Sequence, residues 1–365
     1  MSSPGSLYVH IPFCKHICAY CDFAKVFYQE KWADDYLERL AEELKARDAL
    51  RPFKTVYIGG GSPSALNERQ LEKLLALLKL PVSRSIETTI EVNPEDLSES
   101  KALLMRKAGV SRVSLGVQTF QKKLLERIGR HHDLETVHRA VNFLKAAGIP
   151  RISFDFIYGL PDQTFDDFKA DLKILEQFPE VGHVSFYTLI LEEHTRFYHE
   201  HIQMKDDQWL IEAQQLLIVT LEKMGFRRYE VSNFAKSGEK SLHNLVYWHN
   251  QHYIGVGCGA SGYIDNLRYD NTRSLTQYLK NVTTASQTRV SYEDQMFEEI
   301  MLGLRLVEGV SLTAFEARYG KSLIDIYGDK LQKYLSAGLL VLENNTLKTS
   351  TRGMDVLDEI LLSLM

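Results

Sequence analysis

The chain has 365 residues, of which 44% are hydrophobic and 25% are charged, as is typical of a globular protein with a substantial core. Its 43 lysine and arginine residues against 48 acidic residues give a net charge of −5, without the basic excess that nucleic-acid-binding proteins show. No run approaches the roughly 18 apolar residues that a membrane span needs, so we expect no integral membrane segment.

The amino-terminal residues lack the charged and apolar regions of a secretory signal, and we expect none. There are four cysteines, and three of them lie close together. Cysteines that stay reduced are available for metal binding, which fits a reducing compartment. We therefore expect a cytoplasmic protein.

Short runs of β-forming residues alternate with amphipathic helical patterns over the first 190 residues. Expected strands span residues 7–12, 55–60, 88–94, 112–118, 151–159 and 183–190. Expected helices span residues 33–50, 67–78, 98–108, 121–147 and 164–178. Asn67 and Gln70 have the spacing of a capping box at the start of the second helix. Six successive strand–helix units predict a parallel sheet with right-handed connections.

Unusual segments fall at the carboxyl ends of these expected strands. The cysteine loop follows the first strand, the sequence GGGSP follows the second and EVNP ends the third, while Gln118 ends the fourth and Asp155 lies within the fifth. Barrels of parallel strands carry their functional sites at this rim. The expected fold class is α/β: a partial, TIM-like (β/α)6 barrel over residues 1–225, open on one side.

The remaining chain is expected to form two further parts. After a helix at 206–224, a connecting region over residues 226–290 contains the sequence HNLVYW at 243–248. Residues 291–365 predict a winged-helix-like α+β module, with a helix after Ser311, a second at 325–336 and a hairpin over 338–349. Residues 293–365 carry 7 basic and 12 acidic residues, a balance that disfavours DNA binding by this module.

Cys14, Cys18 and Cys21 have the spacing CxxxCxxC. Three thiolates so placed can hold three irons of a [4Fe-4S] cluster and leave the fourth iron free to bind another group. Zinc is an alternative, but it prefers four ligands, and His16 would have to serve from inside the loop. A disulfide would leave one cysteine over, and inert buried cysteines are the remaining alternative. The lone Cys258 is expected to be a small packed residue.

The cysteine loop resembles that of the radical S-adenosylmethionine (SAM) superfamily. The segments YVHIPFC, GGGSPS, EVNP, GVQTF and DFIYGLP, in this order between residues 8 and 161, resemble its oxygen-independent coproporphyrinogen III oxidase branch. The resemblance covers nearly the whole chain. Oxidases of this branch carry a longer amino-terminal extension and another cysteine two positions after the third, where this chain has Phe23. With HNLVYW, which is similar to an HNxxYW motif, these departures indicate the group of heme chaperones called HemW.

The resemblance implies a [4Fe-4S] cluster on the three clustered cysteines and SAM bound beside it. Glycine lets the main chain approach a ligand closely, so the glycine-rich turn suits the methionyl amine of SAM. The residues implied to contact SAM are Tyr8, Gly60, Gly61, Ser62, Glu91, Gln118, Arg130 and Asp155. Among these, Tyr8 is expected at the methionyl end, Glu91 at the ribose, Arg130 at the carboxylate, and Gln118 and Asp155 near the nucleoside. We expect no catalytic side chain.

Each of these residues also has a simpler interpretation. The glycines could form only a tight turn, and Glu91 and Asp155 could be strand-end charges paired with neighbouring cations. Arg130 could be a solvated charge at the end of a helix. If these residues bind SAM, their side chains should meet in one cavity.

Heme is the third ligand that the resemblance implies. His243 is the expected axial ligand, because neutral imidazole commonly binds heme iron. Its neighbours Asn244, Tyr247 and Trp248 would offer ring faces and a polar group to the macrocycle. The alternative is an aromatic-rich core turn that contains a buried histidine.

The expected function is heme binding and transfer to an acceptor protein, with dependence on the cluster. A respiratory-chain hemoprotein is one candidate acceptor, and a homodimer is an open alternative to a monomer. Whether the protein is also an enzyme stays open. The first competing function is coproporphyrinogen III oxidation, against which Phe23 argues. The second is an iron–sulfur DNA-binding regulator, against which the acidic carboxyl-terminal module argues.

Overall fold

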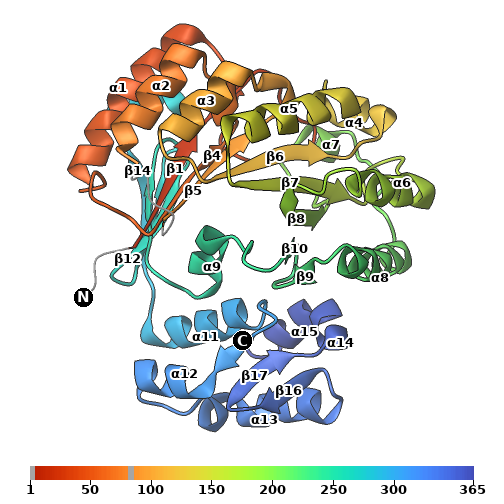
Figure 1. Cartoon of the computed structure of the whole chain (residues 1–365). Coiled ribbons are helices and arrows are strands. Elements are labelled where there is room, and N and C mark those ends of the chain that lie inside the picture. The colour runs from red at the N-terminus through yellow and green to blue at the C-terminus, as the bar shows by residue number, and fades with distance from the viewer. Residues whose placement is uncertain (1–4, 81–85) are drawn as a thin grey trace.

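The computed structural model describes residues 5–80 and 86–365 and is built around one nine-stranded sheet (Figure 1). Six parallel strands lie side by side in chain order, and β11 pairs in parallel with the first of them. At the other edge, β10 pairs antiparallel with β8 and with β9. The strands are β1 Ser6–Ile11, β4 Thr55–Gly60, β5 Glu87–Val92, β6 Arg112–Gln118, β7 Arg151–Tyr158, β8 Val181–Thr188, β9 Arg227–Arg228, β10 Asn233–Ala235 and β11 Ile254–Val256.

The edge strands β11 and β9 are not paired with each other in the described residues, so the barrel is open between them. The expected partial barrel of six parallel strands is therefore confirmed. Strands β9, β10 and β11 come from the stretch expected to connect the two folded parts, and they extend the barrel sheet at both edges. The low hydrophobic periodicity of these two- and three-residue strands left them unpredicted.

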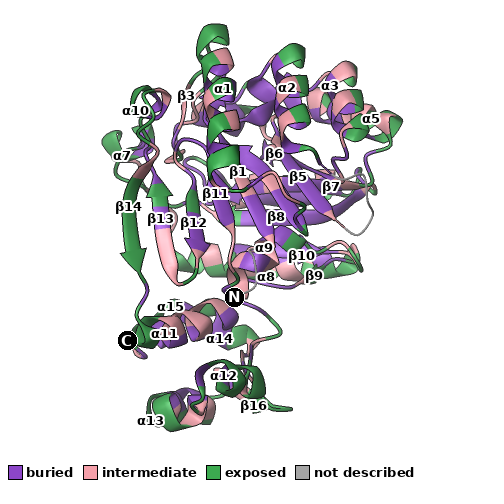
Figure 2. Cartoon of the chain, turned by 90° about the vertical axis from the view of Figure 1, so that its left-hand side faces the viewer, coloured by how far each residue is buried: buried purple, intermediate pink, exposed green. Residues whose placement is uncertain are grey.

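Helices cover the outer face of the parallel strands. Figure 2 shows the strands buried beneath helices whose outer surfaces are exposed. The expected capping box is confirmed, since the Asn67 side chain accepts a hydrogen bond from the Gln70 backbone and the Gln70 side chain accepts one from the Asn67 backbone. These helices are α1 Glu30–Ala46, α2 Glu68–Leu78, α3 Glu99–Lys107, α4 Lys122–Ile128, α5 Leu134–Ala147 and α6 Phe165–Leu175.

The prediction of a single helix over residues 121–147 is wrong, because two helices, α4 and α5, occupy this stretch. Helix α4 ends at Gly129, which adopts a left-handed φ of 78°, and α5 begins after Asp133, whose side chain accepts a hydrogen bond from the Thr136 backbone. A glycine stop followed by an aspartate cap outweighs the apolar periodicity, which continues because each helix buries an apolar face, α4 in a small cluster with Ala19, Leu160 and Phe197 and α5 in the main core. The break places Arg130 between the two helices.

Two smaller sheets and further helices complete the part before residue 290. Strands β12, β13 and β14 form an antiparallel sheet beside β11, and the short strands β2 and β3 pair within the cysteine segment. Helix α8 confirms the helix expected at 206–224. The bounds are β2 Phe13–Cys14, β3 Val26–Phe27, α7 Arg196–His199, α8 Asp207–Lys223, α9 Leu242–Trp248, β12 Ser261–Ile264, β13 Leu267–Asn271, α10 Leu275–Leu279 and β14 Thr284–Arg289.

The carboxyl-terminal module has a core of its own, with Ile300, Phe315, Leu331 and Ile360 fully buried. The two expected helices and the hairpin are confirmed, and a third strand, β15, pairs with β17. In Figure 1 the module lies beyond α9, and the Val307 backbone donates a hydrogen bond to the Tyr229 carbonyl. Its elements are α11 Tyr292–Gly303, β15 Val310–Ser311, α12 Leu312–Tyr319, α13 Leu323–Ser336, β16 Leu340–Glu343, β17 Thr346–Thr349, α14 Thr351–Asp355 and α15 Leu357–Leu362.

None of the helices within residues 5–80 and 86–365 combines the length and apolar character that a membrane crossing requires.

Candidate functional site

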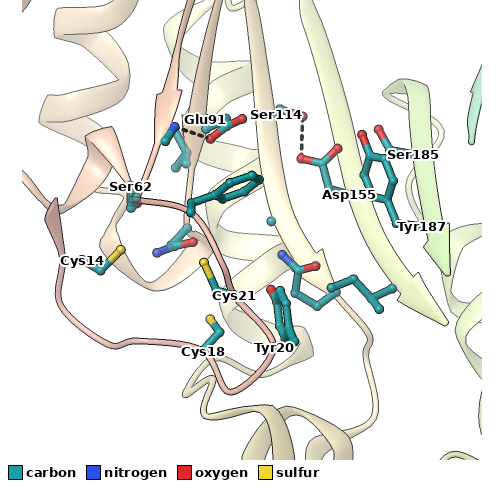
Figure 3. A pocket seen from close by; sticks show the side chains of 18 of the residues that line it. Cys14, Cys18, Tyr20, Cys21, Ser62, Glu91, Ser114, Asp155, Ser185 and Tyr187 are labelled. Atoms are coloured by element: carbon teal, nitrogen blue, oxygen red, sulfur yellow. Dashed lines mark hydrogen bonds between the residues drawn. The ribbon is translucent and has the colours of Figure 1, made fainter. Parts of the chain in front are cut away.

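A cavity of about 470 Å³ occupies the inside of the open barrel. It runs from the cysteine loop, at the carboxyl ends of the strands, toward polar side chains near their amino ends (Figure 3). Every predicted site residue lines this cavity except Tyr8 and His243. Those that line it are Cys14, Cys18, Cys21, Gly60, Gly61, Ser62, Glu91, Gln118, Arg130 and Asp155.

The cysteine loop is anchored to the barrel by backbone hydrogen bonds. The Ser62 backbone donates to the Phe13 carbonyl at 2.8 Å, the Tyr28 backbone donates to the Cys14 carbonyl at 2.8 Å, and the Ala19 backbone donates to the Ile128 carbonyl at 2.9 Å. Figure 3 shows the three thiols of the loop around the same part of the cavity. In the described residues the cysteines form no disulfide, so the disulfide alternative does not describe this loop.

The three cysteines of the loop all line the cavity. Across the described residues, no three histidine, cysteine or acidic side chains converge closely enough to hold one ion. A zinc site needs such convergence, whereas each cysteine of a [4Fe-4S] cluster binds a different iron. Burial raises the pKa of the Cys14 thiol to about 12, and a bound metal would be needed to keep this thiol deprotonated at neutral pH.

The glycine-rich turn after β4 lies between the cysteine loop and Glu91. A Cβ atom at Gly61 would be 2.9 Å from the Cys14 sulfur, and one at Gly59 would be 2.8 Å from the Glu91 carboxyl carbon. The Gly60 backbone donates a hydrogen bond to Glu91 at 3.1 Å. Glycine is therefore required here by close approach on both sides, which goes beyond the formation of a tight turn.

Glu91 and Asp155 face the cavity from neighbouring parts of the barrel. Glu91 accepts a hydrogen bond from the Tyr57 hydroxyl at 2.7 Å. Asp155 accepts one from the Ser114 hydroxyl at 2.8 Å (Figure 3). Burial raises the pKa of Glu91 to about 7, and the Asp155 charge contributes to this increase. Neither carboxylate forms an ion pair within the described chain, so pairing with neighbouring cations does not explain them.

Gln118 and Arg130 reach the cavity from the two sides of helix α4: Gln118 ends β6 before the helix, and Arg130 follows it. Arg130 is 4% exposed, donates a hydrogen bond to the Gly116 carbonyl at 2.9 Å and contacts Glu95 at 3.3 Å. Its Nε has no partner in the described residues. Gln118 ends β6 with a left-handed φ of 66°, a strained conformation for a residue other than glycine. Arg130 is therefore buried, and the interpretation as a solvated helix-end charge is wrong.

Tyr8 lies one layer away from the cavity. Its hydroxyl is 3.0 Å from His10 Nδ1, and its ring stacks on Tyr57 with centroids 6.1 Å apart. It therefore supports the Tyr57 side chain, which lines the cavity and holds Glu91.

His243 lies in the core and does not line the cavity. Its side chain is fully buried, with Nδ1 2.9 Å from the Thr55 hydroxyl and Nε2 2.9 Å from the Tyr247 hydroxyl. Burial lowers the pKa of His243 to about 3, so the ring stays neutral. Because both ring nitrogens are hydrogen-bonded, the geometry does not support the expected contact with heme iron and corresponds to the buried core histidine.

Sequence reasoning missed the polar lining of the lower cavity. Alternate positions of four strands point inward, as the two-residue period of a strand requires. The residues missed are Thr89 on β5, Arg112 and Ser114 on β6, Ser153 on β7, and His183 and Ser185 on β8, and the predicted Glu91 and Asp155 continue the same two-residue spacing on β5 and β7. The signal was a polar residue at every second position of otherwise apolar strands.

Comparison with known proteins agrees with this organisation. The family model described as the radical SAM superfamily matches residues 8–175, and the HemN C-terminal domain matches residues 290–356. Proteins named heme chaperone HemW are similar along most of the chain. The Lactococcus lactis protein is 38% identical over 98% of this chain and 96% of its own length. The Bacillus subtilis protein is 38% identical, and the Escherichia coli protein is 34% identical, each over 92% of both chains.

A solved structure also matches the fold along almost the entire chain. Coproporphyrinogen III oxidase (HemN) from Escherichia coli matches with a TM-score of 0.87 over 99% of this chain and 90% of that one. The two are 23% identical, so this match shows a common fold alone. With relatives 38% identical over nearly its full length, the chain belongs to the HemW family of the radical SAM superfamily.

Proposed function

We propose that this protein is a heme chaperone, which binds heme and transfers it to an acceptor protein in a manner that depends on a [4Fe-4S] cluster. The observation that carries the proposal is the 38% identity to a protein named heme chaperone HemW over 98% of this chain. The superfamily implies an iron–sulfur cluster and SAM, and the cavity has a set of residues that fits both.

Cys14, Cys18 and Cys21 are proposed to hold the cluster. When bound, the cluster and SAM would supply one-electron chemistry at the sulfonium of SAM. The protein contributes orientation, since the loop is fixed to the turn after β4 and to α4 by backbone hydrogen bonds. It also restricts water, because Cys14 is only 7% exposed.

The SAM contacts are proposed from the chemistry of the lining residues. Backbone groups of Gly60, Gly61 and Ser62 suit the methionyl amine, and the unpaired Nε of Arg130 suits its carboxylate. Glu91 and Asp155 can accept hydrogen bonds from ribose hydroxyls and the nucleoside, with Gln118 beside them. We leave Tyr8 and His243 out of the contact set, since neither lines the cavity.

Acceptance of heme by another protein is the second half of the proposal. A respiratory-chain hemoprotein is our candidate acceptor class, and self-association into a homodimer is a further possibility for the chain. Size-exclusion chromatography with light scattering, with and without heme, would measure whether the chain is a monomer or a homodimer.

The proposal is tested by two assays on anaerobically reconstituted protein. An optical titration with heme should saturate at one heme per chain. An incubation with coproporphyrinogen III, SAM and a reductant should give no protoporphyrinogen, because Phe23 stands where the oxidases carry a cysteine. Steady formation of protoporphyrinogen would contradict the chaperone function and favour the oxidase.

A further inference from the structure

The proposed function requires a group that can bind heme iron, and the structure removes His243 from consideration. All twelve histidines lie in the described part of the chain, and two of them, His16 and His183, line the cavity. His183 is 2% exposed near the amino end of β8, with Nε2 2.8 Å from the Tyr229 hydroxyl. His16 is exposed at the mouth, between Cys14 and Cys18.

The imidazole ring of His16 packs against the ring of His131, and in the described part of the chain its nitrogens are free to bind a ligand. Its ring centroid lies 4.3 Å from that of His131, which follows Arg130 in the break between α4 and α5. Within the described residues neither ring nitrogen of His16 has a hydrogen-bond partner. The contact therefore restrains the ring while leaving its nitrogens for a ligand.

The lining of this cavity also carries exposed apolar side chains. Phe23 is 65% exposed, Ile190 is 68% exposed and Tyr187 is 43% exposed, and all three line the cavity. Phe23 comes from the cysteine loop, whereas the other two come from β8 and the residues that follow it. Exposed apolar clusters at a cavity mouth mark ligand-binding surfaces, and a flat macrocycle with apolar edges suits this one.

A positive charge accompanies the apolar surface. Lys25 lines the cavity, and its ammonium donates a hydrogen bond to the Phe23 carbonyl at 3.3 Å. Heme combines a large apolar ring with two carboxylates and an iron that accepts imidazole. The lining thus offers an imidazole for the iron, apolar side chains for the ring and one ammonium for a carboxylate, alongside the carboxylates of Asp22 and Glu192.

We propose that heme binds across the mouth of the cavity, with the His16 imidazole as an iron ligand and with Phe23, Tyr187 and Ile190 against the ring. This inference rests on the proposed function and locates its cargo. Heme so placed lies beside the cysteine loop and remains accessible to an acceptor protein from solution.

The test is an anaerobic optical titration of reconstituted protein with heme, carried out on wild type and single variants. His16→Ala should shift the Soret band and weaken binding by about tenfold or more. Added imidazole should return the wild-type spectrum, a rescue that a structural role would not give. His194→Ala is the matched control, because His194 is exposed and lies outside the cavity lining. Phe23→Ser and Ile190→Ser should weaken binding and leave the ligand spectrum unchanged.

Iron and sulfide contents are measured for each variant, since His16 lies within the cluster loop. The titrations are repeated on cluster-free protein, so that loss of the cluster cannot imitate loss of a heme ligand. If wild type binds no heme, the proposed function fails and this inference fails with it. If wild type binds heme and His16→Ala keeps its spectrum and affinity, the ligand assignment alone is overturned.

Discussion

The sulfur of Cys14 lies directly against Gly61, so closely that a Cβ atom at residue 61 would be 2.9 Å from it and 2.8 Å from the Pro12 carbonyl carbon. The first cysteine of the loop and the turn after β4 are thus fitted to each other. Backbone and sulfur offer little room to move, since both belong to segments fixed by hydrogen bonds. The proposed cluster and the turn therefore depend on the same contact.

Gly61→Ala is expected to lower the iron and sulfide content of reconstituted protein, because the added methyl group displaces the Cys14 sulfur. Gly5→Ala is the matched control, since a Cβ there meets only the flexible Lys54 side chain, at 3.6 Å. Colorimetric iron and sulfide analysis of both variants measures the effect. Equal loading of Gly61→Ala and wild type would show that the contact does not matter to the cluster.

Serine substitution of Cys14, Cys18 or Cys21 should abolish the [4Fe-4S] absorption. Cys258→Ser should retain it, since Cys258 is buried and its thiol donates a hydrogen bond to the Thr272 carbonyl, away from the cavity. Optical and electron paramagnetic resonance spectra after anaerobic reconstitution report the result. Loss of the cluster in Cys258→Ser with retention in Cys18→Ser would reverse our ligand assignment.

The free energy of unfolding should fall as the pH rises through the raised pKa of Glu91. The pKa of this carboxyl is about 7 in the folded protein and about 4.5 when it is unfolded, so the protonated form favours folding. This contribution is complete below pH 4.5 and is lost as the pH passes about 7, with a loss of about 3 kcal/mol.

Glu91→Gln should remove that pH dependence, since glutamine does not titrate. Urea unfolding of both proteins at pH 5 and pH 8 measures it. Ser98→Ala, at a residue outside the cavity lining, serves as a control for general destabilisation. An equal change in unfolding free energy between the two pH values for wild type and Glu91→Gln would contradict the raised pKa.

His243→Ala should destabilise the fold by about 2–3 kcal/mol, because it leaves a cavity in the core and removes the hydrogen bonds of the His243 ring to the Thr55 and Tyr247 hydroxyls. The Thr55 hydroxyl keeps its hydrogen bond to Ser6. The heme spectrum of the folded variant should equal that of wild type. Denaturant unfolding and a heme titration on the same sample measure the two quantities. A shifted Soret band with unchanged stability would return His243 to the role of heme ligand.

The sequence was sufficient to predict the parallel strands and their rim, because buried strands, capping residues and glycines carry local signals. It also predicted most of the residues that line the cavity, since carboxyl ends of parallel strands meet at one edge. It did not reveal that Arg130 lies in a helix break. Apolar periodicity continues across that break and hid the glycine stop and the aspartate cap.

The motifs that contain Tyr8 and His243 do not show whether these two side chains line the cavity. His243 and Tyr8 lie in segments that also contain cavity residues, and only the direction of the side chain separates Asn244, which lines the cavity, from its neighbour His243. Direction depends on the placement of α9 against β4, a long-range contact that no local pattern encodes. The same holds for His16, whose exposure at the mouth follows from the path of the whole loop.

The central claim is that this chain passes heme to another protein with the help of its cluster, and transfer itself is the most direct measurement. Heme-loaded, reconstituted protein is mixed anaerobically with a heme-free respiratory-chain hemoprotein, and the holo-acceptor spectrum is followed in time. We predict that the acceptor fills from wild type and fills markedly less from Cys18→Ser loaded with the same amount of heme. Equal filling from both proteins, or retention of all heme by wild type, would contradict the account.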